Sequence, residues 1–174
     1  MAALFGALHA LSGEQVHDVI VPGWLERGGG HPQFVPWSSV LYLELNQGFL
    51  RLDADQGVLV LARTDRITVP PQLDEDDEFA VASLGSLFLF DGGPAPLTRV
   101  RYWTHHLPDV GQAVVRYAEL EVRGGVRLFV DPMWMPGMRL ATGGFHDQNE
   151  AVFAREREVF GALEEHVISW PTNP

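Results

Sequence analysis

Residues 114–130 read VVRYAELEVRGGVRLFV, and this stretch decides the fold class. Apolar and polar residues alternate on both sides of Arg123-Gly124-Gly125, which is the pattern of a β-hairpin closed by a tight turn. The pattern predicts an inward-facing set made of Val114, Ala118, Leu120, Val122, Val126, Leu128 and Val130. The outward face carries Glu119, Glu121 and Arg127, whose opposite charges can pair across the strands.

Further strands are predicted on the N-terminal side of this hairpin. In 40–45 the residues Leu41, Leu43 and Leu45 share one face, and 49–53 returns with Leu50 and Leu52 inward after a short turn. Such short turns can join only antiparallel neighbours, because parallel strands need a crossover of a dozen or more residues. The continuous apolar run 87–90 is typical of a strand buried on both faces.

Both ends of the chain change to helical spacing. Leu4, Leu8 and Leu11 predict a short N-terminal helix that stops at Ser12-Gly13. Asp147-Gln148-Asn149-Glu150 has the form of a capping box, which opens a helix to about Val167. The apolar stripe of that helix is Val152, Val159, Phe160, Leu163 and Val167.

The predicted fold class is therefore α+β, in a single domain of residues 1–174. An antiparallel β-meander of about eight to ten short strands forms the sheet. A short N-terminal helix precedes it, and a long C-terminal amphipathic helix packs on it, because only the sheet offers a large apolar surface.

Composition excludes several classes of function. The 174 residues hold 12 basic against 23 acidic side chains, for a net charge of -11, and no cysteine. Disulfides, thiolate zinc sites, iron–sulfur clusters and a cysteine nucleophile are thus excluded, and the acidity argues against nucleic acid as a partner. All the basic residues are Arg, which suits structural ion pairs with carboxylates and excludes lysine chemistry. The sequence has no apolar stretch of roughly 20 residues and no leader pattern, so we expect a cytoplasmic protein without a membrane partner.

Catalytic and cofactor motifs are also absent from the sequence. None of the seven His residues has zinc-site spacing, and no serine elbow or phosphate loop is present, so we expect no metal and no cofactor. One alternative remains for an enzyme or small-ligand domain. His105 or His106 could pair with Asp109 as an acid–base couple in a cleft between sheet and helix.

The run Asp74, Glu75, Asp76, Asp77 and Glu78 is the most distinctive segment. Five adjacent carboxylates repel one another, so the segment must lie in water. It is either a solvated loop that aids solubility or a docking surface for a basic partner. A divalent-cation site is a weaker alternative, because the run lacks the alternating spacing of a calcium loop.

A second candidate contact is the loop that contains Met133, Trp134 and Met135 between two prolines. Trp and Met are enriched in binding surfaces, and Met adapts its shape to a partner. We assign both segments to partner binding.

These features predict a small acidic module that binds a basic protein through an acidic and aromatic surface. In composition and architecture the chain resembles bacterial immunity proteins, which neutralise a cognate toxin, and this resemblance implies a basic toxin or enzyme as partner. Two other interpretations stay open: the His105, His106 and Asp109 site described above, and a structural subunit that forms homo-oligomers through strand edges or the final helix.

Overall fold

The computed structural model describes residues 8–27, 30–71, 73, 78–89, 93–107, 112–133 and 137–171. It is mostly antiparallel β-sheet, with 55% strand and 13% helix. The predicted antiparallel sheet is confirmed, but the predicted α+β class is wrong, because so little of the chain is helical.

The strands are β1 (Gln15–Val16), β2 (Asp18–Glu26), β3 (Gln33–Pro36), β4 (Val40–Glu44), β5 (Phe49–Asp55), β6 (Val58–Thr64), β7 (Glu78–Ser83), β8 (Ala95–Leu107), β9 (Gln112–Val122), β10 (Val126–Pro132), β11 (Met138–Thr142) and β12 (Glu164–Ser169). The helices are α2 (Gly85–Phe88), α3 (Phe145–Gln148) and α4 (Glu150–Phe160).

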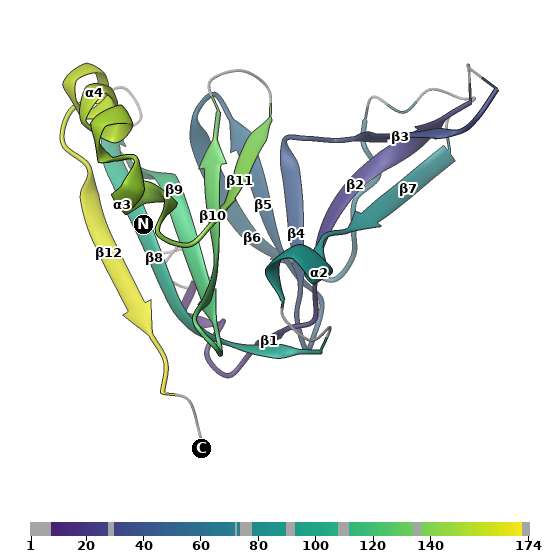
Figure 1. The fold of residues 1–174 in the computed structure, drawn as a ribbon, viewed down its shortest axis with the longest axis horizontal. Helices are drawn as coiled ribbons and strands as arrows, with labels where there is room; N and C mark the ends of the chain where they lie inside the picture. The colour runs from purple at the N-terminus through teal and green to yellow at the C-terminus, as the bar shows by residue number, and fades with distance from the viewer. Residues whose placement is uncertain are drawn as a thin grey trace.

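The strands form one branched sheet with the order β1-β8-β9-β6-β5-β4-β2-β3 (Figure 1). β10 also pairs with β9, while β12 adds to β8 and β7 adds to β2. In each of two strands, β9 and β2, one edge pairs with two different neighbouring strands. β9 pairs with β10 through 118–122 and with β6 at Val115, and β2 pairs with β4 through 18–20 and with β3 through 23–26. These branches let the sheet turn round a core.

The main core confirms the predicted alternation. Leu41, Leu43, Leu50 and Leu52 are at most 1% exposed and belong to the same apolar cluster as the inward side of the β9–β10 hairpin. Within that hairpin Leu120 lies opposite Leu128, as the pattern predicts. Burial of this alternating face fixes the register, because a slip of one residue would turn every leucine outward.

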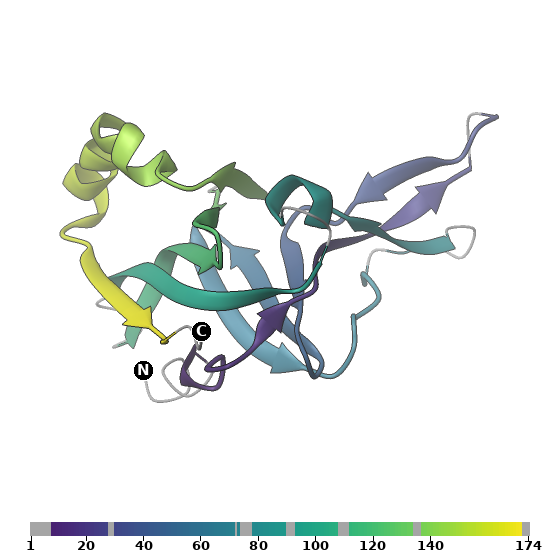
Figure 2. The same ribbon diagram turned by 60° about the horizontal axis from the view of Figure 1, so that its bottom comes forward.

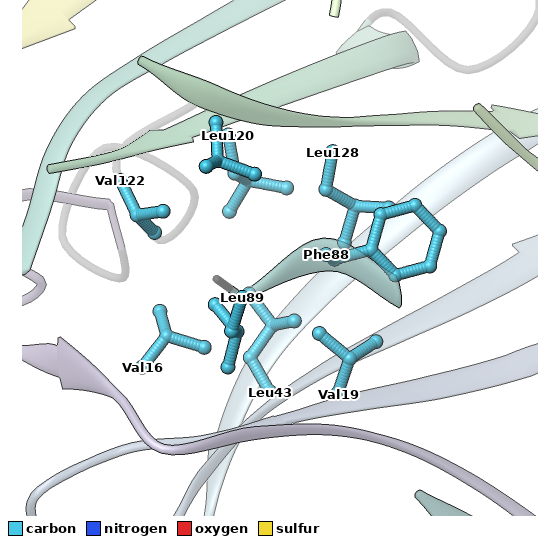
Figure 3. Close-up of a pocket in the computed structure, with 9 residues that line it drawn as sticks. Val16, Val19, Leu43, Phe88, Leu89, Leu120, Val122 and Leu128 are labelled. Carbon is cyan, nitrogen blue, oxygen red and sulfur yellow. The ribbon is translucent and has the colours of Figure 1, made fainter. Parts of the chain in front are cut away.

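Helix α2 closes this core, which corrects the strand predicted at 87–90. Leu87 is 68% exposed, whereas Phe88 and Leu89 point among Val16, Leu43 and Leu128 (Figure 3). The cavity left there has only apolar walls and a volume of about 10 Å³, barely room for one water molecule. A short apolar run does not distinguish a buried strand from a helical turn.

The turn that leads from β7 into α2 is built around the carboxylate of Asp18. Asp18 Oδ1 accepts hydrogen bonds from Val19 N at 2.7 Å, Ser83 Oγ at 2.8 Å and Gly85 N at 2.9 Å. A Cβ at residue 85 would lie 2.4 Å from the same oxygen. Glycine at this position therefore lets the carboxylate reach the turn.

A second apolar layer lies on the other face of β8, β9 and β10. There Phe153 of α4, fully buried, packs with Trp103, Tyr117 and Phe129. This small aromatic core holds α3 and α4 on the sheet (Figure 2).

The long C-terminal helix predicted from Asp147 to Val167 is wrong. Helix α4 ends at Phe160, where Gly161 has a φ of 87° and its N–H still bonds to the Arg157 carbonyl. Glycine tolerates this positive φ, which other residues rarely adopt, and the helix stops here. Residues 164–169 then pair with β8 as β12 and cover its edge, so the end of the predicted helix is a strand.

A β-bulge at Arg116 lets β9 present apolar side chains to the clusters on both faces of the sheet. Trp103 lies opposite Tyr117, and Thr104 lies opposite Val115, so Arg116 has no opposite residue in β8. The extra residue changes the faces: Val115 is in the main core, while Arg116 and Tyr117 both lie on the α4 side. The side chain of Val114, predicted to be inward, lies outside the described residues.

The Arg116 guanidinium is buried together with its counter-ions. It donates to Asp131 at 3.0 Å, to the Pro132 carbonyl at 2.7 Å and to Glu156 at 3.2 Å. Arg139 also donates to Asp131. Because the Arg116 and Asp131 side chains are only 2% and 3% exposed, neither charge can be satisfied by water if its partner is removed.

We expect Asp131→Ala to lower the free energy of unfolding by about 3–5 kcal/mol, because the variant leaves Arg116 buried without its main counter-ion. Asp53→Ala is the matched control: Asp53 also accepts two hydrogen bonds from an arginine, but that pair is 25% and 28% exposed. The control should lose less than about 1 kcal/mol. Urea denaturation of both variants measures the difference, and equal losses would contradict the role of the buried pair.

Candidate functional site

One end of the sheet projects from the body of the molecule as a three-stranded wing. We use this name for residues 23–26 of β2, all of β3, and residues 78–81 of β7. β3 and β7 pair with opposite edges of β2, and the three strands extend away from the rest of the fold (Figures 1 and 2).

A row of apolar side chains crosses one face of the wing. Trp24 pairs with Val35 on one side and with Phe79 on the other, so all three side chains point the same way. Each is partly exposed, and Val81, two residues after Phe79 and thus on the same face, is 48% exposed. The face continues at its base into Trp37, which packs against a small buried cluster.

The far end of the wing is acidic. Glu26 and Glu78 are exposed there, and Glu78 forms an ion pair with Arg27. Of the predicted docking run, only Glu78 is described, as the first residue of β7; Asp74, Glu75, Asp76 and Asp77 lie outside the described residues. Since the run leads directly into β7, its chain enters the wing at this end.

The predicted Met loop is described only at its two ends. Met133 is 42% exposed, while Trp134 and Met135 lie outside the described residues. Met138 N donates to the Ser38 carbonyl at 2.8 Å, two residues after β3 ends. Both predicted partner-binding segments therefore connect to the wing, one at its outer end and one near its base.

A polar pocket lies at the opposite end of the sheet, between α3, α4, β8 and β12. Its volume is about 330 Å³, within the range of small-ligand sites. The lining side chains are Arg101, Trp103, His146, Asp147, Glu150, Arg157, Leu163 and Glu165.

His146 is the most unusual side chain of this pocket. Its ring is stacked between Trp103, at 4.3 Å between ring centroids, and Phe153, at 4.5 Å, and the residue is only 7% exposed. Burial lowers the pKa of His146, an effect that Asp147 opposes and the charges of Arg101 and Arg157 reinforce. The imidazole is therefore neutral at neutral pH.

Arg101 holds two carboxylates at the pocket. It forms a two-pronged pair with Glu165, at 2.8 and 3.1 Å, and also donates to Asp147 at 3.2 Å. The hydrogen bond from Arg101 lowers the pKa of Glu165. Partial burial acts to raise the pKa of Asp147, but the charge and hydrogen bond of Arg101 together with the contact to His146 outweigh it, and the pKa is lowered. Both carboxylates are ionised at neutral pH.

Of the predicted acid–base site only the side chain of His105 is described, and it does not line this pocket. His105 is 4% exposed, and burial together with the charge of Arg116 lowers its pKa. The side chain of His106 and all of Asp109 lie outside the described residues.

The structure instead pairs His146 with the adjacent Asp147, whose Oδ1 is 3.5 Å from Nδ1. Sequence reasoning missed this pair because Asp147 was explained as a helix cap. In the structure Asp147 lies inside α3 and α4 follows Asn149, which makes no side-chain cap.

Two features are absent from the described residues. No group of three or more His, Cys, Asp or Glu side chains among them could hold a metal ion. None of their helices is long and apolar enough to span a membrane.

Comparisons with known protein families, curated proteins and solved structures found no match to this chain. Function must therefore be argued from the wing and the pocket themselves.

We expect His146 to make the protein less stable in mild acid. Between its lowered folded pKa and about 6.5, the unfolded chain binds a proton that the folded chain does not, so stability is complete above about pH 6.5 and falls as pH falls through that window. His146→Phe keeps a stacked ring but cannot titrate. The loss of unfolding free energy between about pH 7.5 and 5.5, measured by urea denaturation, should be smaller in the variant. His105 shifts in the same direction but is common to both proteins, so equal losses would contradict the prediction.

Proposed function

We propose that this chain is a protein-binding module that docks a basic protein partner on its wing. The observation that carries the proposal is the row of Trp24, Val35 and Phe79, partly exposed on a projecting three-stranded sheet. Aromatic side chains of this kind supply much of the binding energy in protein interfaces. A partner that covers these apolar side chains removes them from water, which makes docking favourable at this face.

Charge favours a basic partner. The net charge is -11, and the outer end of the wing carries Glu26 and Glu78, with the run 74–77 next to it in sequence. An acidic surface attracts a basic protein from a distance and raises the rate of encounter. An immunity-type inhibitor of a basic toxin or enzyme would need this combination of fast encounter and apolar contact.

The size of the wing indicates that the partner also contacts neighbouring segments. Three strands about 4.8 Å apart and four residues long, at about 3.3 Å each, give a face of about 190 Å² in projection. A standard interface buries about 800 Å² on each partner. Met133, which is 42% exposed, and Met138, whose N–H donates to the Ser38 carbonyl at the base of the wing, are described residues that can enlarge this surface.

We expect Val81→Arg to abolish capture of the partner, because it places a positive charge on the apolar face that a basic protein would cover. Val60→Arg is the matched control: it makes the same change on β6, at a valine that is 52% rather than 48% exposed. Each immobilised variant is incubated with lysate of the native host at low and high salt. The proposal requires a basic protein that wild type and Val60→Arg retain at low salt and Val81→Arg does not. Identical recovery by the two arginine variants would refute the wing as the docking face.

The acidic run should act mainly on the rate of association. Replacing residues 74–78 by Asn and Gln should lower the association rate with the captured partner by at least about tenfold at low salt, and change dissociation little. Surface plasmon resonance across a salt series measures both rates. Replacing five exposed carboxylates elsewhere on the surface in the same way controls for net charge alone: Asp55, Asp65, Glu150, Glu158 and Glu164. An unchanged association rate would reduce the run to a solubilising loop.

A further inference from the structure

Strand β7 borders the wing, and the backbone of its outer edge points away from β2 (Figure 1). Trp37 N donates to the Pro22 carbonyl at 2.7 Å, so the backbone of Pro22 faces β3. Pro22 lies opposite Val81, and this pair therefore exchanges no hydrogen bonds. The N–H and C=O of Val81 thus point outward, and alternation gives those of Phe79 the same direction. Among the described residues, β7 pairs only with β2.

A second hydrogen bond gives the same alternation. Leu84 N donates to the Val19 carbonyl at 2.7 Å, and these two residues continue the register of β7 on β2. Even-numbered residues of β7 therefore bond to β2, and odd-numbered residues face outward. The outward residues Phe79 and Val81 also carry side chains of the apolar face of the wing. Backbone hydrogen-bonding groups and apolar side chains are thus available together at this edge.

Two other edge strands carry features that discourage further pairing. In β3, Pro36 lies opposite Gly23 and faces outward, where its lack of an N–H interrupts the edge. Strand β12 begins with the charged residues Glu164 and Glu165. After Glu78, by contrast, β7 reads Phe-Ala-Val-Ala-Ser, with neither a proline nor a charge. An edge of this kind is a template for an additional strand.

We infer that the basic partner adds an extended segment to β7, antiparallel to it, as a fourth strand of the wing. The inference rests on the proposed function, which places that partner on the wing. The added strand exchanges hydrogen bonds with Phe79 and Val81, and its apolar side chains lie beside theirs.

Charge decides both the occupant and its direction. Arg27 pairs with Glu78 at the outer end of the wing, but Glu26 is exposed there and the run 74–77 directly precedes β7. Antiparallel pairing brings the C-terminal end of the added segment to this acidic end, so its basic residues belong there. A second copy of the chain does not fit, because each copy has a net charge of -11.

The test is amide hydrogen exchange of the full chain, measured by NMR. The probe is a peptide with blocked ends that alternates Thr and Val over six residues, the length of β7, and ends in two Arg. Without peptide, the Phe79 and Val81 amides should exchange rapidly, whereas those of Ala80 and Ala82 are protected by β2. Peptide at about 1 mM should slow exchange at Phe79 and Val81 at least about fivefold. Unchanged exchange would overturn the inference.

The chain without peptide tests for other occupants of the edge. Protection of Phe79 and Val81 that does not depend on protein concentration would place a segment of this chain there. Protection that increases with protein concentration would place a second copy there. Either result would overturn the inference.

Two further peptides test the chemistry and the direction of pairing. N-methylation of every Thr and Val amide removes the hydrogen-bond donors and should abolish the added protection. Moving the two Arg to the N-terminal end should weaken binding at least about threefold. Equal binding of the N-methylated peptide would contradict strand addition, and equal binding of the rearranged peptide would contradict the antiparallel direction.

Substitutions locate the edge. Val81→Pro removes the outward N–H but no hydrogen bond to β2, and should weaken peptide binding at least about tenfold. Val167→Pro on β12 is the matched control, at a valine that is 47% rather than 48% exposed. Trp170 N donates to the Thr98 carbonyl, so alternation makes Val167 face outward as well. The control should bind the peptide as wild type does. Undiminished binding by a folded Val81→Pro would refute the assignment, and the N-methylated peptide decides if that variant does not fold.

Capture of the partner separates this inference from the proposed function. A basic protein that wild type and Val81→Pro retain, but Val81→Arg does not, would dock on the apolar face without using the edge. That result would overturn the inference and leave the proposed function standing. Loss of the partner from both Val81 variants, with retention by Val167→Pro, supports both. If wild type retains no basic protein, the proposed function fails, and the occupant assigned to the edge fails with it.

Discussion

The fold depends on one constraint: β9 must present apolar side chains to two separate cores while it carries a buried arginine. Leu120 and Val122 complete the main core on one face, and Tyr117 joins the aromatic core on the other. The bulge makes this possible, because the extra residue lets Arg116 and Tyr117 lie side by side on the α4 face. Once Arg116 is buried, its charge requires Asp131 and Glu156 at the positions they occupy. The same contacts tie β9 to β10 and to α4. The buried ion pairs and the apolar packing therefore both hold α4 on the sheet.

The aromatic core in turn builds the polar pocket. Trp103 contributes to that core and also receives Arg101 over its ring, at 4.4 Å to the centroid. His146 continues the stack, and Phe153 closes it. Because Arg101 and Trp103 are two residues apart on β8, they share the face that α3 and α4 cover. The pocket is thus the space left where the short helices α3 and α4 meet β8 and its edge neighbour β12.

Sequence reasoning succeeded where the determinants were local. The β9–β10 hairpin and the leucine faces of β4 and β5 follow from a period of two and short turns, and both are confirmed. It failed where a distant partner decided the outcome. Residues 164–169 have no local feature that excludes a helix, and they become a strand because the edge of β8 is available. Arg116 breaks the alternation by a single residue, and only the pairing with β8 shows that this is a bulge. The pairing of His146 with Asp147 was visible as adjacent residues, but the capping-box pattern gave Asp147 a different role. The wing could not be foreseen, since it requires β2 to pair with three different strands, β4 and β3 along one edge and β7 along the other.

The distribution of arginines explains why the acidic excess of the chain is carried by its surface. Nine of the twelve form ion pairs with described carboxylates: Arg27, Arg51, Arg63, Arg99, Arg101, Arg116, Arg127, Arg139 and Arg157. Most positive charges are therefore paired with carboxylates of the chain itself, and the surplus of acidic residues sets the electrostatic field around the molecule. At the wing that field meets a broad apolar face, which suits a large basic surface. Under the proposed function this acidic excess steers a basic protein toward the wing, where the apolar row of Trp24, Val35 and Phe79 provides the contact.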